Sequence, residues 1–206
     1  MPSSPKIPKE LILKTALDLL IENGYGNVTI KAVAERMNSS TQPISWHFGS
    51  MNGFRKALAE YALSYANEKM KPVSKNSVTA FTEIGSAYID IAFDMPHLFK
   101  YLYLNEGSDY CAGTFETFVS AVNNPGIIRE TADFFRISDE KAVEYLSNTV
   151  IYSHGLLALV VSGVLKADRQ TVRDKINNAG FAFLSQAGGD TEKAAKADNR
   201  LLPPRN

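Results

Sequence analysis

The stretch from Thr29 to Phe48, TIKAVAERMNSSTQPISWHF, constrains the fold of this 206-residue chain more than any other. Its first half predicts a short helix capped by Thr29, with one apolar face made of Ile30, Val33, Ala34 and Met37 at i, i+3, i+4 and i+7. Asn38 follows, and Asn enters the left-handed backbone region more readily than most non-glycine residues. The pattern therefore predicts a short amphipathic helix that ends in a tight turn.

A second short helix is predicted directly after this turn. Ser40 is its expected N-cap, and Pro43 falls in its first turn, where a missing backbone N–H does little harm. Ile44, His47 and Phe48 return to the core side, which leaves five side chains facing outward: Thr41, Gln42, Pro43, Ser45 and Trp46. Two short helices joined by a tight turn, the second exposing small polar groups, indicate a helix-turn-helix whose recognition helix enters the DNA major groove.

Any helical hairpin has an inner and an outer face, so the pattern alone is equally compatible with an ordinary pair of helices. The flanking sequence is more specific. An amphipathic first helix ends in ENGYGNVT, the segments IKAVAERM and STQPISWHF follow, and GSMNGFRKAL opens a long fourth helix. In this order and spacing, residues 9–58 resemble the N-terminal DNA-binding domain of TetR family (tetracycline repressor-like) transcriptional regulators.

Individual residues can be given expected roles in DNA binding. Gln42 can pair with adenine, and Pro43 or the methyl group of Thr41 can touch thymine, so these three are expected at base edges. Ser40 begins the same helix and belongs to the predicted DNA-binding set. By resemblance, further residues are expected to contact phosphates, namely Thr29, Ser45, Trp46 and His47, with Lys31 adding its ammonium group.

The chain departs from the usual family pattern at several positions. Asn38 stands where Gly is common in the turn, and Met51 stands where the family usually has a phosphate-contacting lysine. Residues 1–60 contain seven Lys or Arg and five Asp or Glu, in a chain whose formal net charge is zero. We therefore expect few phosphate contacts per subunit and a modest dependence of DNA affinity on salt.

The remaining sequence also predicts helices, and 45% hydrophobic residues are enough for a core. No alternation typical of a strand competes with this interpretation. The predicted fold is all-α. It consists of a three-helix, homeodomain-like helix-turn-helix domain in residues 1–50, a C-terminal helical ligand-binding and dimerisation domain in 51–187, and a flexible tail in 188–206.

The predicted helix over residues 138–164 is apolar on more than one side, so a partner surface is expected. Together with the helix that follows Asp168, it resembles the four-helix dimer interface of the same family. The expected interface residues are Tyr145, Leu157, Val161, Ile176 and Phe183. The alternative is that 138–164 is the central core helix of a monomer. A homodimer would place two recognition helices on a near-palindromic operator in double-stranded DNA.

Aromatic residues are frequent in the middle of the chain and suggest a cavity for an unknown small-molecule effector. The resemblance implies an inducer pocket there, and the expected lining residues are Tyr88, Phe93, Phe99, Tyr103 and Phe118. Each aromatic residue taken singly is better explained as core than as pocket. Asp90, Asp94 and His97 lie beside Pro96, where they would supply polar contacts to a ligand or belong to a solvated loop.

Catalysis and membrane insertion find no support in the sequence. There is no GxSxG, HExxH or P-loop motif, and Cys111 has no metal-ligand partner at a recognised spacing, so we expect no enzyme, metal or cofactor. The N-terminus lacks an apolar signal core, and the longest apolar segment, 149–165, is too short to span a membrane. A cytoplasmic location is expected, since a single cysteine fits a reducing compartment.

The sequence thus predicts a sequence-specific DNA-binding transcriptional regulator, expected to be a repressor, whose operator affinity is modulated by a small molecule in the C-terminal domain. The alternative is a helical interaction protein that keeps the fold but has lost DNA binding.

Overall fold

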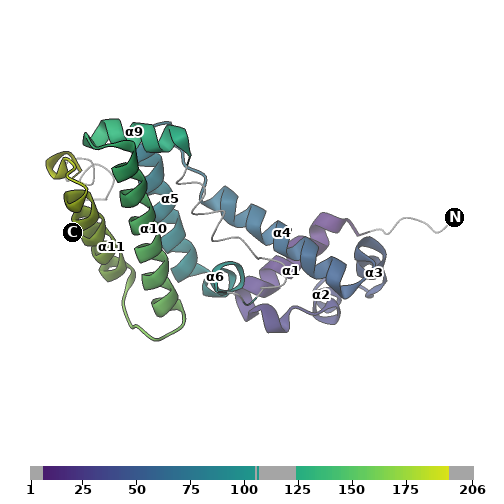
Figure 1. Ribbon diagram of the computed structural model, residues 1–206. Helices are drawn as coiled ribbons and strands as arrows, with labels where there is room; N and C mark the ends of the chain where they lie inside the picture. Colours follow the sequence, from purple (N-terminus) through teal and green to yellow (C-terminus); the bar gives the residue numbers. More distant parts are fainter. Residues whose placement is uncertain (1–6, 105, 107–123, 195–206) are drawn as a thin grey trace. The chain divides into compact units, whose positions relative to one another are not determined.

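The computed structural model describes residues 7–104, 106 and 124–194, and within these residues every regular element is a helix (Figure 1). The predicted all-α fold class is confirmed. Backbone contacts divide the chain into two compact units. Among the described residues, the first unit comprises 7–69, 94–104 and 106, and the second comprises 70–93 and 124–194.

The first unit is organised around its N-terminal helix. Its elements are α1 (Lys9–Asn23), the short 3-10 helix η1 (Tyr25–Asn27), α2 (Ile30–Arg36), α3 (Gln42–Phe48), α4 (Met51–Lys69) and α6 (Pro96–Tyr103). Helix α1 contacts each of the others. The core contains side chains that are fully shielded from water, among them Ile12, Leu20, Val33, Ile44, Phe54, Leu58 and Leu98.

The predicted helix-turn-helix is present as α2 and α3. The Thr29 hydroxyl oxygen accepts a hydrogen bond from the Ala32 N–H at 3.0 Å and so caps α2 as predicted. Asn38 has a φ of 49°, and the Ser39 N–H donates to the Ala34 carbonyl at 2.9 Å, which closes the turn. The left-handed conformation expected of Asn38 is therefore confirmed.

The expected cap of the second helix is wrong. Helix α3 begins after Thr41, which already has a helical backbone and makes no side-chain capping bond. The Ser40 side chain is exposed, and its carbonyl accepts a hydrogen bond from the Ser39 hydroxyl. Pro43 does lie in the first turn of α3, as predicted.

Helix α4 follows α3 after a very short connection. The Ser50 hydroxyl accepts the Gly53 N–H at 3.0 Å, which confirms Ser50 as the predicted cap. A Cβ atom at position 53 would collide with the Phe48 carbonyl, so glycine is needed for this close approach. Phe48 and Phe54 also meet edge to face, with ring centroids 5.3 Å apart. These contacts fix the end of α3 on the start of α4.

The second unit contains α5 (Ser77–Asp94, through Phe93), α9 (Pro125–Phe135), α10 (Asp139–Val161) and α11 (Arg169–Gln186). Helix α10 packs against both α9 and α11 (Figure 1). The N-caps of α10 and α11 are as predicted, since the Ser138 hydroxyl accepts from the Lys141 N–H and the Asp168 carboxylate accepts from the Thr171 N–H. No helix in the described residues is long and apolar enough to cross a membrane.

The two units do not follow the expected division at residue 50. Helix α4 belongs to the first unit through Lys69, because Phe54, Leu58 and Ala62 are buried in its core, and α6 joins the same unit. Residues 190 and 193, which were expected in the tail, instead make contacts within the second unit. The Asp190 N–H donates to the Phe135 carbonyl at 3.0 Å, and the Lys193 ammonium lies 4.2 Å from the centroid of the Phe134 ring. Residues 195–206 lie outside the described part of the chain.

The turn between α2 and α3 can be tested by two substitutions at one site. We expect Asn38→Val to lower the free energy of unfolding by about 1–2 kcal/mol, because a β-branched residue is strained at positive φ. Asn38→Gly is the control and should change it by less than about 1 kcal/mol. Urea denaturation followed by circular dichroism measures both values. Equal losses in the two variants would contradict this account.

Candidate nucleic-acid interface and small-molecule cavity

The residues predicted to contact DNA lie at the start of α2 and along α3. Thr29, Lys31, Ser40, Thr41, Gln42, Ser45 and Trp46 are exposed, and Pro43 and His47 are half-buried. Ile44, by contrast, is 0% exposed and fixes which face of α3 turns inward. Trp46 is 58% exposed, which is a large apolar surface for a soluble helix to present to water. The outward face thus combines hydroxyl, amide and indole groups.

Two groups at the start of α2 are available to a phosphate. The Thr29 oxygen caps the helix as an acceptor, which leaves its hydroxyl hydrogen for an outside partner. The Lys31 ammonium lies 3.7 Å from the Glu35 carboxylate, with both side chains highly exposed. Such a surface ion pair contributes little to stability, so Lys31 can exchange this partner for a phosphate.

His47 has a different position from the one expected of a phosphate contact. Its Nε2 lies 2.9 Å from the carbonyl oxygen of Ile7, which ties the start of the described chain to α3. The imidazole also meets the Trp46 indole edge to face, with centroids 5.0 Å apart. His47 therefore uses this nitrogen within the unit and supports the exposed tryptophan.

A cavity of about 410 Å³ lies within the second unit, lined by α5, α9, α10 and α11 and by Ala194. Its volume is in the range of small-molecule sites, about 300–1,000 Å³. Aromatic side chains from all four helices contribute to the lining, namely Phe81, Tyr88, Phe135, Tyr145 and Phe181. Burial raises the pKa of Tyr145 to about 12, so its phenol stays neutral at physiological pH.

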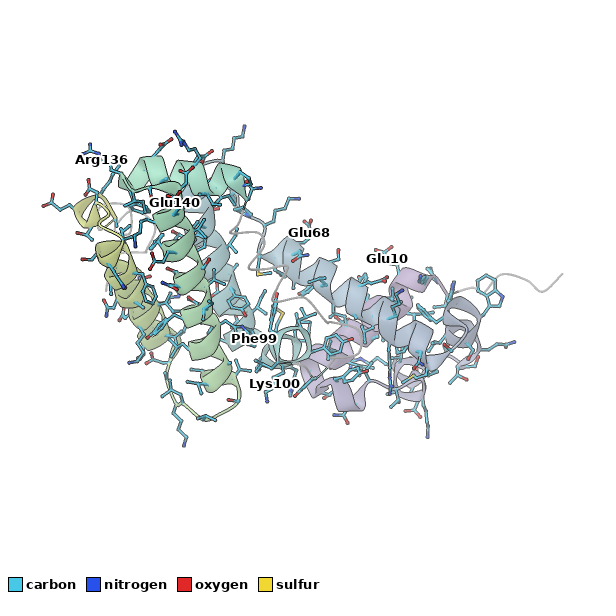
Figure 2. The ribbon with its side chains drawn as sticks, viewed as in Figure 1. Glu10, Glu68, Phe99, Lys100, Arg136 and Glu140 are labelled. Carbon is cyan, nitrogen blue, oxygen red and sulfur yellow. The ribbon has the colours of Figure 1, made fainter. Side chains whose placement is uncertain are left out.

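The expected pocket residues are only partly brought together. Tyr88 lines the cavity, whereas Phe93 lies beneath the Arg169 guanidinium at 5.4 Å and is not part of the lining. Phe99 lies on α6 (Figure 2), and Tyr103 lies on the same helix. Both are buried in the first unit and are not part of the cavity lining. Phe118 lies outside the described residues. The prediction that Phe99 and Tyr103 line the pocket was wrong because the aromatic content of the sequence does not show which helices α6 packs against.

Polar groups gather at the α5 side of the cavity. Asp90 lines the cavity, which is the position needed for a polar contact to a ligand. Its Oδ1 accepts hydrogen bonds from Arg169 and Arg173, both at 2.9 Å. Neither arginine was singled out from the sequence, since they lie 79 and 83 residues away from Asp90. His97 instead lies against Gly24 in the first unit.

His154 on α10 lies inside the second unit. Its Nδ1 is 2.8 Å from the Tyr88 hydroxyl, and the two rings are stacked with centroids 6.4 Å apart. Burial lowers the pKa of His154, so the neutral imidazole is favoured in the folded chain.

The expected dimer residues do not share one outer face. Leu157 is 0% exposed, and Tyr145 and Ile176 line the cavity, so these three are turned into the unit. Val161 and Phe183 are half-buried. The apolar side chains that α10 exposes are instead Ile151, Tyr152 and Leu159, and the Tyr152 ring meets Phe183 on α11 at 6.2 Å. After Glu144, helix α10 carries apolar residues on more than one side, so its sequence could not show which side faces outward.

The lowered pKa of His154 predicts a pH dependence of stability. In the unfolded chain the pKa of a histidine is about 6.5, and in the folded chain the pKa of His154 is lower. The stability contribution is therefore complete above about pH 6.5 and is lost as the pH falls through the folded pKa. We expect the free energy of unfolding to fall more between pH 7.5 and 5.5 in the original chain than in His154→Gln. His47 and His97 remain in both, so parallel pH curves would exclude this role for His154.

Comparisons with known proteins agree with the arrangement of the first unit. Residues 12–58 match the family model described as "Bacterial regulatory proteins, tetR family". Over 67 residues the chain is 31% identical to the tetracycline repressor protein class C of Escherichia coli. That match covers 32% of this chain and 31% of the repressor, so it spans about a third of the relative's length.

Solved structures are similar in fold over most of the chain. A TetR-family transcriptional regulator from Rhodococcus sp. matches with a TM-score of 0.60 and 17% identity, covering 85% of this chain and 97% of that one. A TetR variant from Acinetobacter baumannii AYE in complex with minocycline has a TM-score of 0.52 and 18% identity, covering 88% and 96%. RolR without ligand has a TM-score of 0.53 and 16% identity, covering 96% and 100%. At these identities the likeness is one of fold.

Proposed function

The chain belongs to the tetR family of bacterial regulatory proteins, and we propose that it is a repressor that binds a near-palindromic DNA operator. It is a transcriptional regulator with an N-terminal DNA-binding domain. The observation that supports the finer proposal best is the orientation of α3. Ile44 is shielded in the core, while Thr41, Gln42, Ser45 and Trp46 are exposed on the other sides of the same short helix. Such a regulator acts in the cytoplasm, where bacterial DNA lies.

The exposed start of α3 suits direct reading of bases. The Gln42 amide can donate to adenine N7 and accept from adenine N6 in the major groove, and the Thr41 methyl or the Pro43 ring can contact a thymine methyl. Phosphates are contacted by Thr29, Lys31, Ser45 and Trp46. Ser40 lies exposed beside them. His47 contributes by holding Trp46 and Ile7 in place.

Dimerisation is proposed through the outer faces of α10 and α11. Ile151 and Leu159 are 55% and 46% exposed, and they lie on one side of α10 with Tyr152, next to Phe183 of α11. Exposed apolar groups at helical spacing indicate a contact with another protein surface. A twofold dimer places two α3 helices on half-sites about 34–36 Å apart, or a multiple of that spacing.

The cavity of the second unit is the proposed effector site. A small molecule that binds one arrangement of the dimer better than the other shifts the population between them and so changes operator affinity. The volume of about 410 Å³ and the aromatic lining support this role. The minocycline complex of the Acinetobacter protein, which has the same fold, also supports it.

Substitutions on α3 and α2 separate base reading from phosphate contact. We expect Gln42→Ala to relax base preference at one position per half-site by about 1–3 kcal/mol, with little change on random DNA. Lys31→Ala should weaken all sequences alike and make the affinity less dependent on salt. Fluorescence anisotropy with operator, operator variants and random duplexes measures these changes.

Equal losses on operator and random DNA for Gln42→Ala would refute its assigned role. If the unaltered chain shows no selective binding to genomic fragments even at low salt, the interaction protein without DNA binding becomes the better description.

The proposed dimer face is tested by placing a charge on it. We expect Leu159→Glu to convert the dimer to monomers at micromolar concentration, because two buried like charges at a symmetric contact are strongly unfavourable. Leu11→Glu makes the same change at an exposed leucine of α1 and serves as the control. Sedimentation velocity reports the mass. A Leu159→Glu chain that stays dimeric would exclude this face.

A further inference from the structure

Three charged side chains line the cavity in the described part of the chain, namely Glu83, Asp90 and Arg173. A buried or half-buried charge requires a partner, so the partners of these groups indicate what the cavity still lacks. Glu83 is already satisfied. Its carboxylate accepts hydrogen bonds from the Ser74 hydroxyl and from the N–H groups of Val73 and Ser74, and these bonds lower the pKa of Glu83. Glu83 therefore does not require a cationic ligand.

Asp90 is also satisfied, and its surroundings are positive. Its Oδ1 accepts from the guanidinium groups of Arg169 and Arg173 at 2.9 Å each. A cationic ligand that approached Asp90 would meet both guanidinium groups and be repelled. Asp90 thus positions the arginines and is unsuited to be the primary ligand contact.

Arg173 is the charged group that still has N–H donors for a ligand. Its side chain is only 20% exposed and lines the cavity. A guanidinium has five N–H donors, and within the described residues only its Nη2 has a polar partner, Asp90. Asn177 lies one turn further along α11, on the same side, and its amide also lines the cavity. Together they place guanidinium and amide donors on one side of α11, beside the cavity.

Three of the lining hydroxyls of α5 and α10 do not compete for this role. Thr82, Thr149 and Ser153 each donate to the carbonyl four residues earlier, at 3.2, 2.8 and 2.7 Å. Their hydrogens are used within the helices, so they present only lone pairs to the cavity. The remaining wall is largely apolar, with Phe81, Phe135, Phe181 and Leu184 among its members.

We propose that the effector is a small amphipathic carboxylate, whose carboxylate accepts hydrogen bonds from Arg173 and Asn177 while its apolar body contacts the aromatic wall. A planar carboxylate matches the guanidinium fork in a bidentate arrangement and gains from its charge. The inference rests on the proposed function only in taking this cavity as the effector site. Carboxylate binding itself is measured without DNA.

The test uses one apolar body with three head groups, namely 2-naphthylacetate, its neutral amide and the cation 2-(2-naphthyl)ethylamine. Each is titrated into the full chain at pH 7.5 and followed by isothermal calorimetry. We expect the carboxylate to bind about tenfold to a hundredfold more tightly than the amide, as hydrogen bonds to charged groups imply, and the cation to bind more weakly still.

Substitutions test whether Arg173 causes the preference for the carboxylate over the amide. Arg173→Met should remove most of the advantage of the carboxylate over the amide and leave amide affinity within about twofold, since Asp90 keeps Arg169 as its partner. Arg129→Met on α9 is the matched control, because Arg129 is exposed, pairs with Asp133 and Asp139, and is outside the cavity lining. If Arg173→Met does not fold, Asn177→Asp provides the same test by adding a negative charge beside Arg173, and it should weaken carboxylate binding selectively.

The proposal is overturned if the amide or the amine binds as tightly as the carboxylate, if no probe binds at millimolar concentration, or if the carboxylate preference survives in Arg173→Met or Asn177→Asp. Failure of the proposed function has a different signature. In that case the carboxylate preference is present, but the chain shows no selective binding to operator DNA.

Discussion

The burial of Ile44 is the contact on which the whole outward face of α3 depends. Helix α3 has seven residues, too few to be stable alone, so its position comes from its packing on the first unit. Complete burial of an isoleucine side chain contributes about 1.5–3 kcal/mol. The Phe48–Phe54 contact and the close approach at Gly53 fix the other end of the helix. Since Ile44 points inward, Gln42 and Trp46 must point to water.

In the second unit, one helix contributes to two proposed functions. The inner side of α10 provides Tyr145, Leu146 and Val150 to the cavity, and its outer side exposes Ile151 and Leu159. A molecule in the cavity therefore contacts the same rigid element that is proposed to meet a second subunit. This continuity gives ligand binding a physical route to the geometry of a dimer without a long chain of intermediate contacts.

Local features of the fold were predictable because their causes lie within a few residues. The caps at Thr29, Ser50, Ser138 and Asp168 and the left-handed Asn38 all follow from side chains that bond or bend the backbone beside them. The exception is the start of α3. Ser40 was the expected cap, but the helix starts one residue later, after Thr41, which makes no side-chain capping bond.

The sequence by itself determined the all-helical class, the helix-turn-helix and the outward direction of Thr41, Gln42 and Trp46, because periodicity and capping are local. Only the tertiary structure decided that Phe99 and Tyr103 belong to the first unit and that Leu157 faces inward. It also brought Arg173 to Asp90 across 83 residues. A helix with apolar residues on more than one side does not show which side faces the core, and the partner of a charge is set by distant elements that pack beside it.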